Sequence, residues 1–420
     1  MPSTTASPPH RPGPPADPRR RLLLDLGAAL LAGGLPVHDV EEELRALGRA
    51  LGAPEARVAA LTTGLFVALD DEEATVFQPV GPGLRFEQTA DVLHLVHRLR
   101  TGRLDGHLDG HGALAELDRI RRAPAHWPAW VADLGVVPVG VGICLYLQPV
   151  PANIAASAVG SLIVAALTTL TRRLPLLRPL LPVTAGFLVA LLVLLAAQGG
   201  LLDGPLRTIV ATLAILLPGA LLVTGLSEIA AGAASAGTAR LVSGSVQLAL
   251  FLTGVAAAAS AVHAPASALA NVQTATAGWW ATCLGLALAV AGIVVNVHTP
   301  PRAIPWIVAV VAVTAAVQVP VSAAGGAAVG GLAGAVTAAV AATLAHWLPG
   351  GPLWQVVYLP AFWIVVPGSF GLLNAAQIEV GNGAHAVLTA VSAVFGVSVG
   401  TLIGSVISRI PRPRLRPRRA

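Results

Sequence analysis

The chain has 420 residues, of which 55% are hydrophobic and only 11% are charged. This composition lies outside the range of soluble globular domains and is typical of polytopic membrane proteins. All 26 basic residues are arginine, which excludes the phosphate-binding lysine of P-loop ATPases and any Schiff-base lysine. The net charge of +5 comes largely from the two chain ends, and the basic-aromatic pattern of a nucleic-acid-binding protein is absent from the sequence.

The first 129 residues have a different composition from the rest. Residues 1–20 are rich in Pro, Ser and Thr, which predicts a disordered leader. Residues 21–129 show helical spacing over 22–32, 40–51, 86–99 and 113–122, and β-prone runs over 58–68 and 74–80. An acidic turn, residues 70–73, separates the two β-prone runs and predicts a hairpin. We therefore expect a small cytoplasmic α+β domain.

This predicted domain also carries a tandem Leu-Asp-Gly-His, residues 104–107 and 108–111. Two His and two Asp at close spacing could hold a metal ion, but Gly106 and Gly110 favour a flexible exposed turn. The sequence shows neither a nucleophile elbow nor a zinc-protease motif, so we expect no metal, no cofactor and no enzyme activity. Cys144 and Cys283 both lie in apolar runs and are interpreted as packing residues.

Ten apolar segments follow, each about the length that crosses a bilayer. They cover residues 131–147, 152–171, 180–197, 206–224, 241–263, 278–297, 304–322, 324–346, 357–373 and 384–407. An even number of spans returns the chain to its starting side. The arginine-rich tail at 409–420 and the arginines of the alternate loops indicate that both ends are cytoplasmic. We expect an all-α polytopic protein of the cytoplasmic membrane.

An internal repeat relates the two halves of this region. Residues 215–232, ILLPGALLVTGLSEIAAG, recur 149 positions later as residues 364–381, IVVPGSFGLLNAAQIEVG. Five spans in each half make the second copy run in the opposite direction, so we expect two inverted repeats, 130–264 and 276–408. Each copy has Pro-Gly within an apolar run, where a broken helix must face a protein interior or a wet cavity. Gly326, Gly330 and Gly334 have the spacing of a helix-packing motif.

The order of these parts resembles the threonine/serine exporter family (ThrE). The resemblance is carried by Gly33-Gly34 with Val40-Glu41, by residues 113–120 with Pro124, by residues 217–219 to 232 with 236–237, and by 359–360 with 366–368. It implies export of small hydrophilic amino acids coupled to the proton gradient. One residue departs from the family pattern: an acidic residue, usually Asp, follows the first Pro-Gly, and this chain has Glu228.

Several residues near the two Pro-Gly pairs could bind an amino acid. Hydroxyl and amide groups that could meet its carboxylate and ammonium belong to Thr224, Ser227, Ser369, Asn374 and Gln377. Pro218-Gly219 and Pro367-Gly368 would act through backbone, because a half-helix N-terminus offers N–H groups and partial positive charge. The alternative is a kinked helix without a ligand, in which the hydroxyls cap their own helices.

Glu228 is the candidate for proton coupling, since an ionisable group in a membrane segment is costly unless paired or wetted. The alternative places Glu228 at the cytoplasmic edge, meeting water or Arg240. Glu379 is interpreted as an interface residue.

The sequence therefore predicts a secondary active exporter of threonine or serine that works by alternating access. Its expected partners are the amino acid, protons and the lipid bilayer, and a homo-oligomer is compatible with it. Two alternatives stay open. One is a dicarboxylate exporter of the same architecture, and the other is a membrane-anchored enzyme or regulator acting through the N-terminal domain.

Overall fold

The computed structural model describes residues 17–70, 74–102, 110–270, 274, 278–365 and 383–408. The chain divides into two compact units, Met1–Leu84 with Asp91–Ala123, and Arg85–Ala90 with Pro124–Ala420. All strands that the described residues form belong to the first unit, and the second is built from helices.

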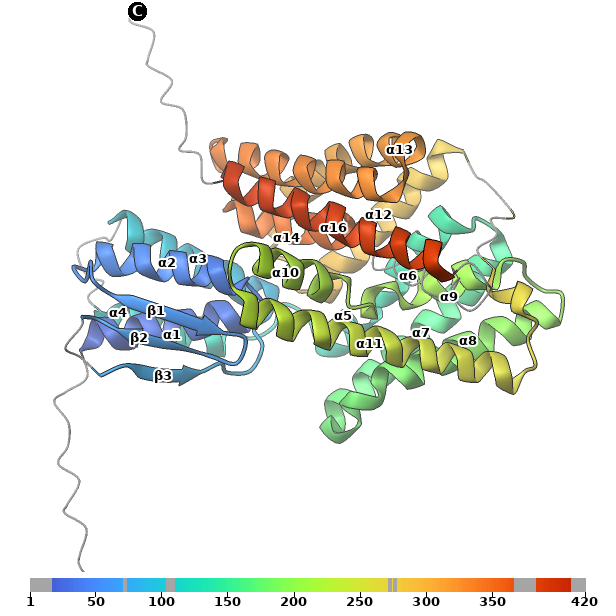
Figure 1. Ribbon diagram of the computed structural model, residues 1–420, viewed down its shortest axis with the longest axis horizontal. Helices are drawn as coiled ribbons and strands as arrows, with labels where there is room; N and C mark the ends of the chain where they lie inside the picture. The colour runs from blue at the N-terminus through green and yellow to red at the C-terminus, as the bar shows by residue number, and fades with distance from the viewer. Residues whose placement is uncertain are drawn as a thin grey trace, which may run out of the picture. The chain divides into compact units, whose positions relative to one another are not determined.

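The first unit is a three-stranded sheet with helices packed on it (Figure 1). Its elements are α1 (Pro18–Ala32), α2 (Val37–Ala50), β1 (Arg57–Leu61), β2 (Gly64–Ala68), β3 (Val76–Pro79), most of α3 (Phe86–Thr101) and α4 (Gly110–Arg122). The strands are antiparallel in the order β1-β2-β3, and α1 and α2 contact the sheet. Leu65 and Val67 are fully buried, whereas Phe66 and Phe77 pair on the exposed face with ring centroids 4.9 Å apart.

Most of the predicted elements of this unit are present. The four predicted helical regions form α1 to α4. The run of residues 58–68, predicted as one β-prone segment, contains two strands because the chain turns at Thr62 and Thr63, between the paired residues Leu61 and Gly64. Of the acidic turn, Asp70 is described and residues 71–73 lie outside the described residues.

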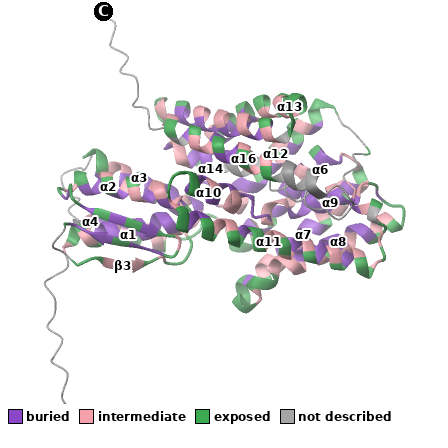
Figure 2. Ribbon diagram, in the orientation of Figure 1, coloured by how far each residue is buried: buried purple, intermediate pink, exposed green. Residues whose placement is uncertain are grey.

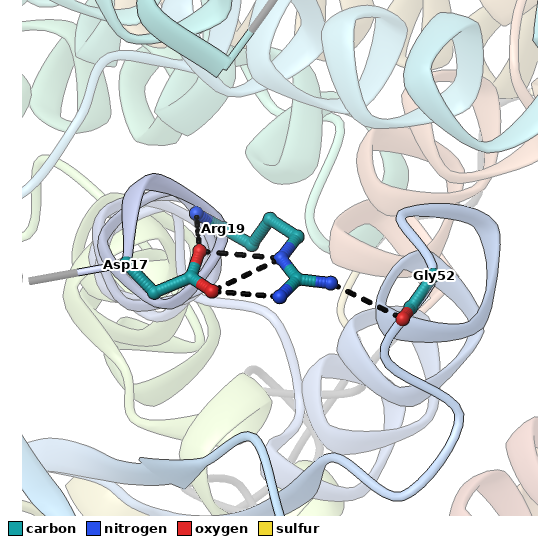
Figure 3. A network of polar contacts seen from close by, with 3 residues as sticks. All are labelled: Asp17, Arg19 and Gly52. Atoms are coloured by element: carbon teal, nitrogen blue, oxygen red, sulfur yellow. Dashed lines mark hydrogen bonds and ion pairs between the residues drawn. The ribbon is translucent and has the colours of Figure 1, made fainter.

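Two helix ends of this unit are joined by a polar network (Figure 3). The Asp17 carboxylate caps α1 by accepting the Arg19 backbone N–H at 2.8 Å, and the Arg19 guanidinium lies against the same carboxylate. Arg19 Nη1 also donates to the carbonyl oxygen of Gly52 at 3.2 Å, just beyond the C-terminus of α2. One arginine therefore binds a helix N-cap and a neighbouring helix end at once.

Among its described residues, the second unit contains seven helical segments long and apolar enough to cross a membrane, or eight when one bent pair counts as a span. They are Ala129–Leu147, made of α5 (Ala129–Leu134) and α6 (Val136–Leu147); α7 (Pro151–Arg173); Pro175–Gln198, made of η1 (Pro175–Leu180) and α8 (Leu181–Gln198); the bent pair Pro205–Leu216 and Gly219–Ala230; α11 (Ala234–Ala261); α12 (Trp279–Asn296); Pro301–Gly326; and Ala328–Trp347. These eight coincide with the first eight predicted segments.

The last two predicted segments are described only in part. α14 (Trp354–Val365) covers the first half of the ninth, and residues 366–382 lie outside the described residues. α16 (Gly383–Ser408) covers the tenth. The short turns η3 (Ala266–Leu269) and η4 (Pro301–Ala303) complete the unit.

The helix α13 (Ile304–Trp347) comprises the predicted seventh and eighth spans. Its 44 residues would extend about 66 Å, roughly twice the hydrocarbon core of a bilayer. Gly326 interrupts it with φ 81° and ψ 173°, a backbone conformation that is essentially confined to glycine. A Cβ at Gly326 would meet no atom within 4 Å, so this glycine serves the chain reversal, not the helix packing predicted for it.

Glycines bring the long helices into close contact. α11 lies along α8, and α16 lies along α13 (Figure 1). A Cβ at Gly186 of α8 would lie 2.7 Å from the Phe251 carbonyl oxygen of α11, and one at Gly400 of α16 would lie 2.6 Å from Ala335 Cβ of α13. Such spacing lets backbones approach without intervening side chains, which is how membrane helices pack.

Candidate functional site

The fourth span is broken at its Pro-Gly pair. α9 (Pro205–Leu213) continues into the 3-10 turn η2 (Ala214–Leu216), and Leu217 then adopts extended backbone with φ −69° and ψ 139°. α10 (Gly219–Ala230) begins after Pro218, at 61° to the preceding helical segment. Proline lacks the N–H that would continue the helix and disfavours helical geometry at the residue before it. The break predicted at Pro218-Gly219 is thus present.

The break leaves polar backbone groups on both of its sides, a carbonyl group before it and N–H groups after it. The Leu216 carbonyl oxygen accepts a 3.0 Å hydrogen bond from Gln247 Nε2 of α11. The N-terminus of α10 has no side-chain cap, so its first-turn N–H groups keep their partial positive charge. Pro218 and Gly219 are buried, and Thr224, one turn further along α10, is half-buried. A buried, uncapped helix N-terminus can bind a carboxylate.

Glu228 lies near the other end of α10 and is fully buried. Its Oε2 lies 3.0 Å from Nε of Arg240 in α11, whose side chain is 15% exposed. Nine residues of helix separate Gly219 from Glu228, which is about 14 Å, so the structure does not bring the carboxylate to the break. A carboxylate near a helix C-terminus is disfavoured by the helix dipole, and the Arg240 cation offsets that.

A tight connection holds the pair together. Gly232, with φ 91°, ends α10 in a Schellman motif in which the Ala233 N–H donates to the Glu228 carbonyl at 2.8 Å. The two helices then approach at Gly225 and Gly237, where a Cβ on Gly225 would lie 2.8 Å from the Gly237 carbonyl oxygen. Glu228 and Arg240 therefore face each other across a helical hairpin.

Ser227, a predicted substrate-binding residue, contacts α16. Its Oγ is 3.5 Å from the Ser398 carbonyl oxygen, and Ser398 Oγ in turn donates to the Val223 carbonyl at 3.3 Å. Both serines are buried. α10 is thereby linked to the last helix, and Ser227 is engaged there and not at the break.

A second buried carboxylate pairs with arginine within the same unit. Asp133 of α5 is 3% exposed and forms an ion pair with Arg172 of α7, and it accepts a 2.6 Å hydrogen bond from Thr169 Oγ1. Among the described residues, this unit thus has two buried carboxylates, Asp133 and Glu228, that each pair with an arginine.

Sequence reasoning missed Gln247, Ser398 and Asp133. An amide or carboxylate within an apolar run was the available signal for Gln247 and Asp133, while nothing in the sequence marks Ser398. The second-copy candidates Pro367, Gly368, Ser369, Asn374 and Gln377 lie outside the described residues, as does Glu379. Most of the tandem Leu-Asp-Gly-His does too.

The two ends of α10 therefore offer two different polar features, one that can bind an anion and one that can bind a proton. The break offers uncapped N–H groups at its N-terminus. The hairpin offers a carboxylate that is shielded from solvent and held by one arginine. Nearly all of α9, which leads to the break, is buried (Figure 2).

Comparison with known protein families gives a match. The model of the ThrE family, described as "Putative threonine/serine exporter", matches residues 21–262, more than half of the chain. This range includes most of the first unit, the broken span and the Glu228–Arg240 hairpin. No curated protein and no solved structure matches the chain.

Proposed function

Because the chain belongs to the threonine/serine exporter family, we propose that it is a secondary active transporter that exports threonine and serine across the cytoplasmic membrane. The observation that carries the proposal is the broken fourth span, which joins an uncapped helix N-terminus to a buried carboxylate–arginine pair. Both features lie within the residues that match the family. Transport, and not an enzymatic reaction, is the activity to test.

The architecture we propose is ten spans in two inverted repeats. Helix bounds recur at the sequence offset of 149: α9 and α14 begin at Pro205 and Trp354, and α11 and α16 begin at Ala234 and Gly383. The close contact of residues 186 and 251 likewise recurs at residues 335 and 400. α6 and α12, equivalent at this offset, pack antiparallel, because Gly135 meets Gly292 and Gly142 meets Gly285. Opposite directions for equivalent helices support an inverted second copy.

The substrate site we propose lies at the two breaks. In the first copy, the N–H groups after Pro218 and Gly219 would bind the amino acid's carboxylate, and Thr224 lies one turn away. Ser227 would need to leave Ser398 to take part. In the second copy the proposed contributors are Pro367, Gly368, Ser369, Asn374 and Gln377. Nearby arginines that would favour a dicarboxylate are engaged, Arg240 with Glu228 and Arg207 with the Leu147 carbonyl.

The proposed coupling to protons rests on a difference in exposure between the two members of the ion pair, Glu228 and Arg240. A proton that binds Glu228 leaves a neutral acid, which can stay in its buried place, while Arg240 reaches solvent through its exposed fraction. The attraction between α10 and α11 is then lost at this end. α10 can shift and change access to the break at its other end. Release of the proton on the opposite side restores the pair, so one inward proton accompanies one outward amino acid.

Threonine efflux from preloaded proteoliposomes, with and without an imposed proton gradient, tests the proposal. We expect the gradient to accelerate efflux by the parent protein. Glu228→Gln keeps the shape of the side chain but cannot release a proton, so it should retain threonine exchange at zero gradient and lose acceleration by the gradient. Asp118→Asn, a change at an exposed site of the first unit, should behave as the parent.

Succinate serves as the comparison substrate. Succinate flux without threonine flux would replace the proposal with the dicarboxylate exporter, and flux of neither would replace it with a regulator or enzyme. Gradient-driven efflux that survives Glu228→Gln would remove Glu228 from the coupling step while leaving the exporter assignment in place.

A further inference from the structure

Five buried polar side chains form a ladder between two spans at some distance from the Glu228–Arg240 pair. They are Asn153, Ser157 and Ser161 on α7, and Thr208 and Thr212 on α9. Each is at most 1% exposed. Asn153 Nδ2 donates to Thr208 Oγ1 at 2.7 Å, and Thr212 Oγ1 donates to Ser157 Oγ at 3.0 Å.

The register of the ladder leads to the break. Both hydrogen-bonded pairs are separated by 55 residues, so α7 and α9 run parallel, and the same offset would place Ser161 opposite residue 216. At that position η2 ends and Leu217 is extended. The Ser161 end of the ladder thus points toward the broken backbone, and Ser161 Oγ packs against Gly140 of α6. The other end of the ladder reaches the connection at Asp203, whose carbonyl oxygen accepts from Asn153 Nδ2 at 2.7 Å.

The two end residues each retain an unsatisfied polar atom. Asn153 Oδ1 and Ser161 Oγ have no hydrogen-bond partner among the residues that the structure describes. The orientation of the Asn153 amide is fixed, because the Asp203 carbonyl can only accept and so must face the nitrogen. Buried polar atoms without partners are rare, so each of these two needs an explanation.

The second half of the chain provides an internal comparison. At the offset of 149, Ser161, Thr208 and Thr212 correspond to Val310, Val357 and Ala361, all of them buried and apolar. These residues lie on α13 and α14, which also pack together. In the second half, α13 and α14 therefore pack without polar residues at these three positions. Among the helices compared, the ladder occurs only between α7 and α9.

We propose that this ladder is the path by which the exported amino acid passes between the break and the Asp203 connection, an inference that rests on the proposed export function. Ser161 Oγ binds the substrate at the break, and Asn153 Oδ1 accepts from its ammonium or hydroxyl group at the far end. Eight residues of helix separate the two, about 12 Å, so they act in succession. The Asn153–Thr208 and Ser157–Thr212 hydrogen bonds close the path in this conformation, and substrate hydroxyl and ammonium groups replace them during passage.

The test measures threonine efflux from proteoliposomes by the parent and three variants. Ser161→Ala removes one unsatisfied atom, and Thr208→Val/Thr212→Ala gives the ladder the residues of the second copy. Thr343→Val is the matched control, because Thr343 is equally buried and donates to its own helix at Ala339. We expect KM for threonine to rise about tenfold in the first two variants, the effect of one lost hydrogen bond, and to be unchanged in the control.

A comparison substrate separates binding from folding. 2-Aminobutyrate lacks the hydroxyl of threonine, so Ser161→Ala should affect its KM less than that of threonine. Unchanged KM for threonine in folded Ser161→Ala and Thr208→Val/Thr212→Ala, with threonine flux in the parent, would overturn the ladder while leaving the exporter. A Thr208→Val/Thr212→Ala chain that does not fold would show the ladder to be structural and would also overturn it. Absence of threonine flux in the parent would overturn both proposals.

Discussion

Single residues carry the sharpest energetic consequences in this protein because its membrane unit contains so few charges. Glu228 is fully buried, and the Arg240 cation lies 3.0 Å from it. Removing a partner from such a pair leaves an uncompensated charge, whereas removing both leaves none. The two residues should therefore behave non-additively.

We predict that Arg240→Ala lowers the free energy of unfolding in detergent by about 3–5 kcal/mol. The same change in a Glu228→Gln background should cost markedly less, and chemical denaturation of the four proteins measures the difference. Arg173→Ala, at an exposed arginine, is the control and should lie within about 0.5 kcal/mol of the parent. Equal effects of Arg240→Ala in both backgrounds would mean that the pair is not coupled.

Asp17 gives a prediction with a defined pH dependence. The hydrogen bond from Arg19 holds the pKa of the Asp17 carboxyl below its usual value, despite partial burial. A folded-state pKa below the unfolded one means that the ionised cap stabilises α1 fully above the unfolded pKa, near 3.9. This stabilisation is lost as pH falls through the lower, folded pKa.

Hydrogen exchange in the first turn of α1 measures the effect. Asp17→Asn can still cap the helix, so protection should become independent of pH in the acidic range. Asp17→Ala removes the cap and should cost about 1 kcal/mol at neutral pH. If the parent and Asp17→Asn lost protection in parallel on acidification, another carboxylate would be responsible.

At the scale of elements, the break at Pro218 is supported by one side chain from a different helix. Gln247 of α11 donates to the Leu216 carbonyl that the broken helix leaves unpaired. We predict that Gln247→Leu costs about 1–3 kcal/mol, the penalty of leaving this partly buried carbonyl unsatisfied. Gln198→Leu, which removes an amide bonded to the Val262 carbonyl at an exposed site, should cost less. Thermal unfolding of the two variants compares them, and equal losses would contradict a special role for Gln247.

Elements could be predicted from the sequence to very different degrees. The eight spans follow from long apolar windows, and the break follows from Pro218, since both are local signals. The sequence also offers Arg240 as a partner for Glu228, because only a short turn separates their helices. By contrast, Ser398 bonds to Val223 from 175 residues away, and Asn153 to Thr208 from 55. Such contacts depend on which helix faces become neighbours, and hydropathy does not contain that information.

The role of Gly326 also could not be predicted from the sequence alone. Its spacing with Gly330 and Gly334 predicted packing, because helical spacing is all that the sequence displays. The structure instead places Gly326 at a chain reversal that requires a positive φ. The Gly330 position does fit close packing, since a Cβ there would collide with Ser322.

For the whole molecule, the proposed topology makes a prediction about sidedness. The connections at Leu176 and Ala231 should face the cytoplasm, and Leu201 should face the opposite side. Leu176 and Leu201 are 90% and 70% exposed, so cysteines there should accept a membrane-impermeant thiol reagent. In chains lacking Cys144 and Cys283, we expect Leu176→Cys and Ala231→Cys to be labelled in inside-out vesicles and Leu201→Cys in right-side-out vesicles. Labelling of Leu176→Cys and Leu201→Cys from the same side would contradict the alternation of spans.

The short turn at Gly232 also affects how the chain inserts into the membrane during synthesis. Only Ala231, Gly232 and Ala233 separate α10 from α11, so Arg240 leaves the ribosome 12 residues (240 − 228) after Glu228. Their contact is local and can form at the speed of helical hairpins, before the later spans exist. The nascent hairpin therefore carries its own counter-ion into the lipid, and insertion of the buried acid does not wait for α16 to be synthesised.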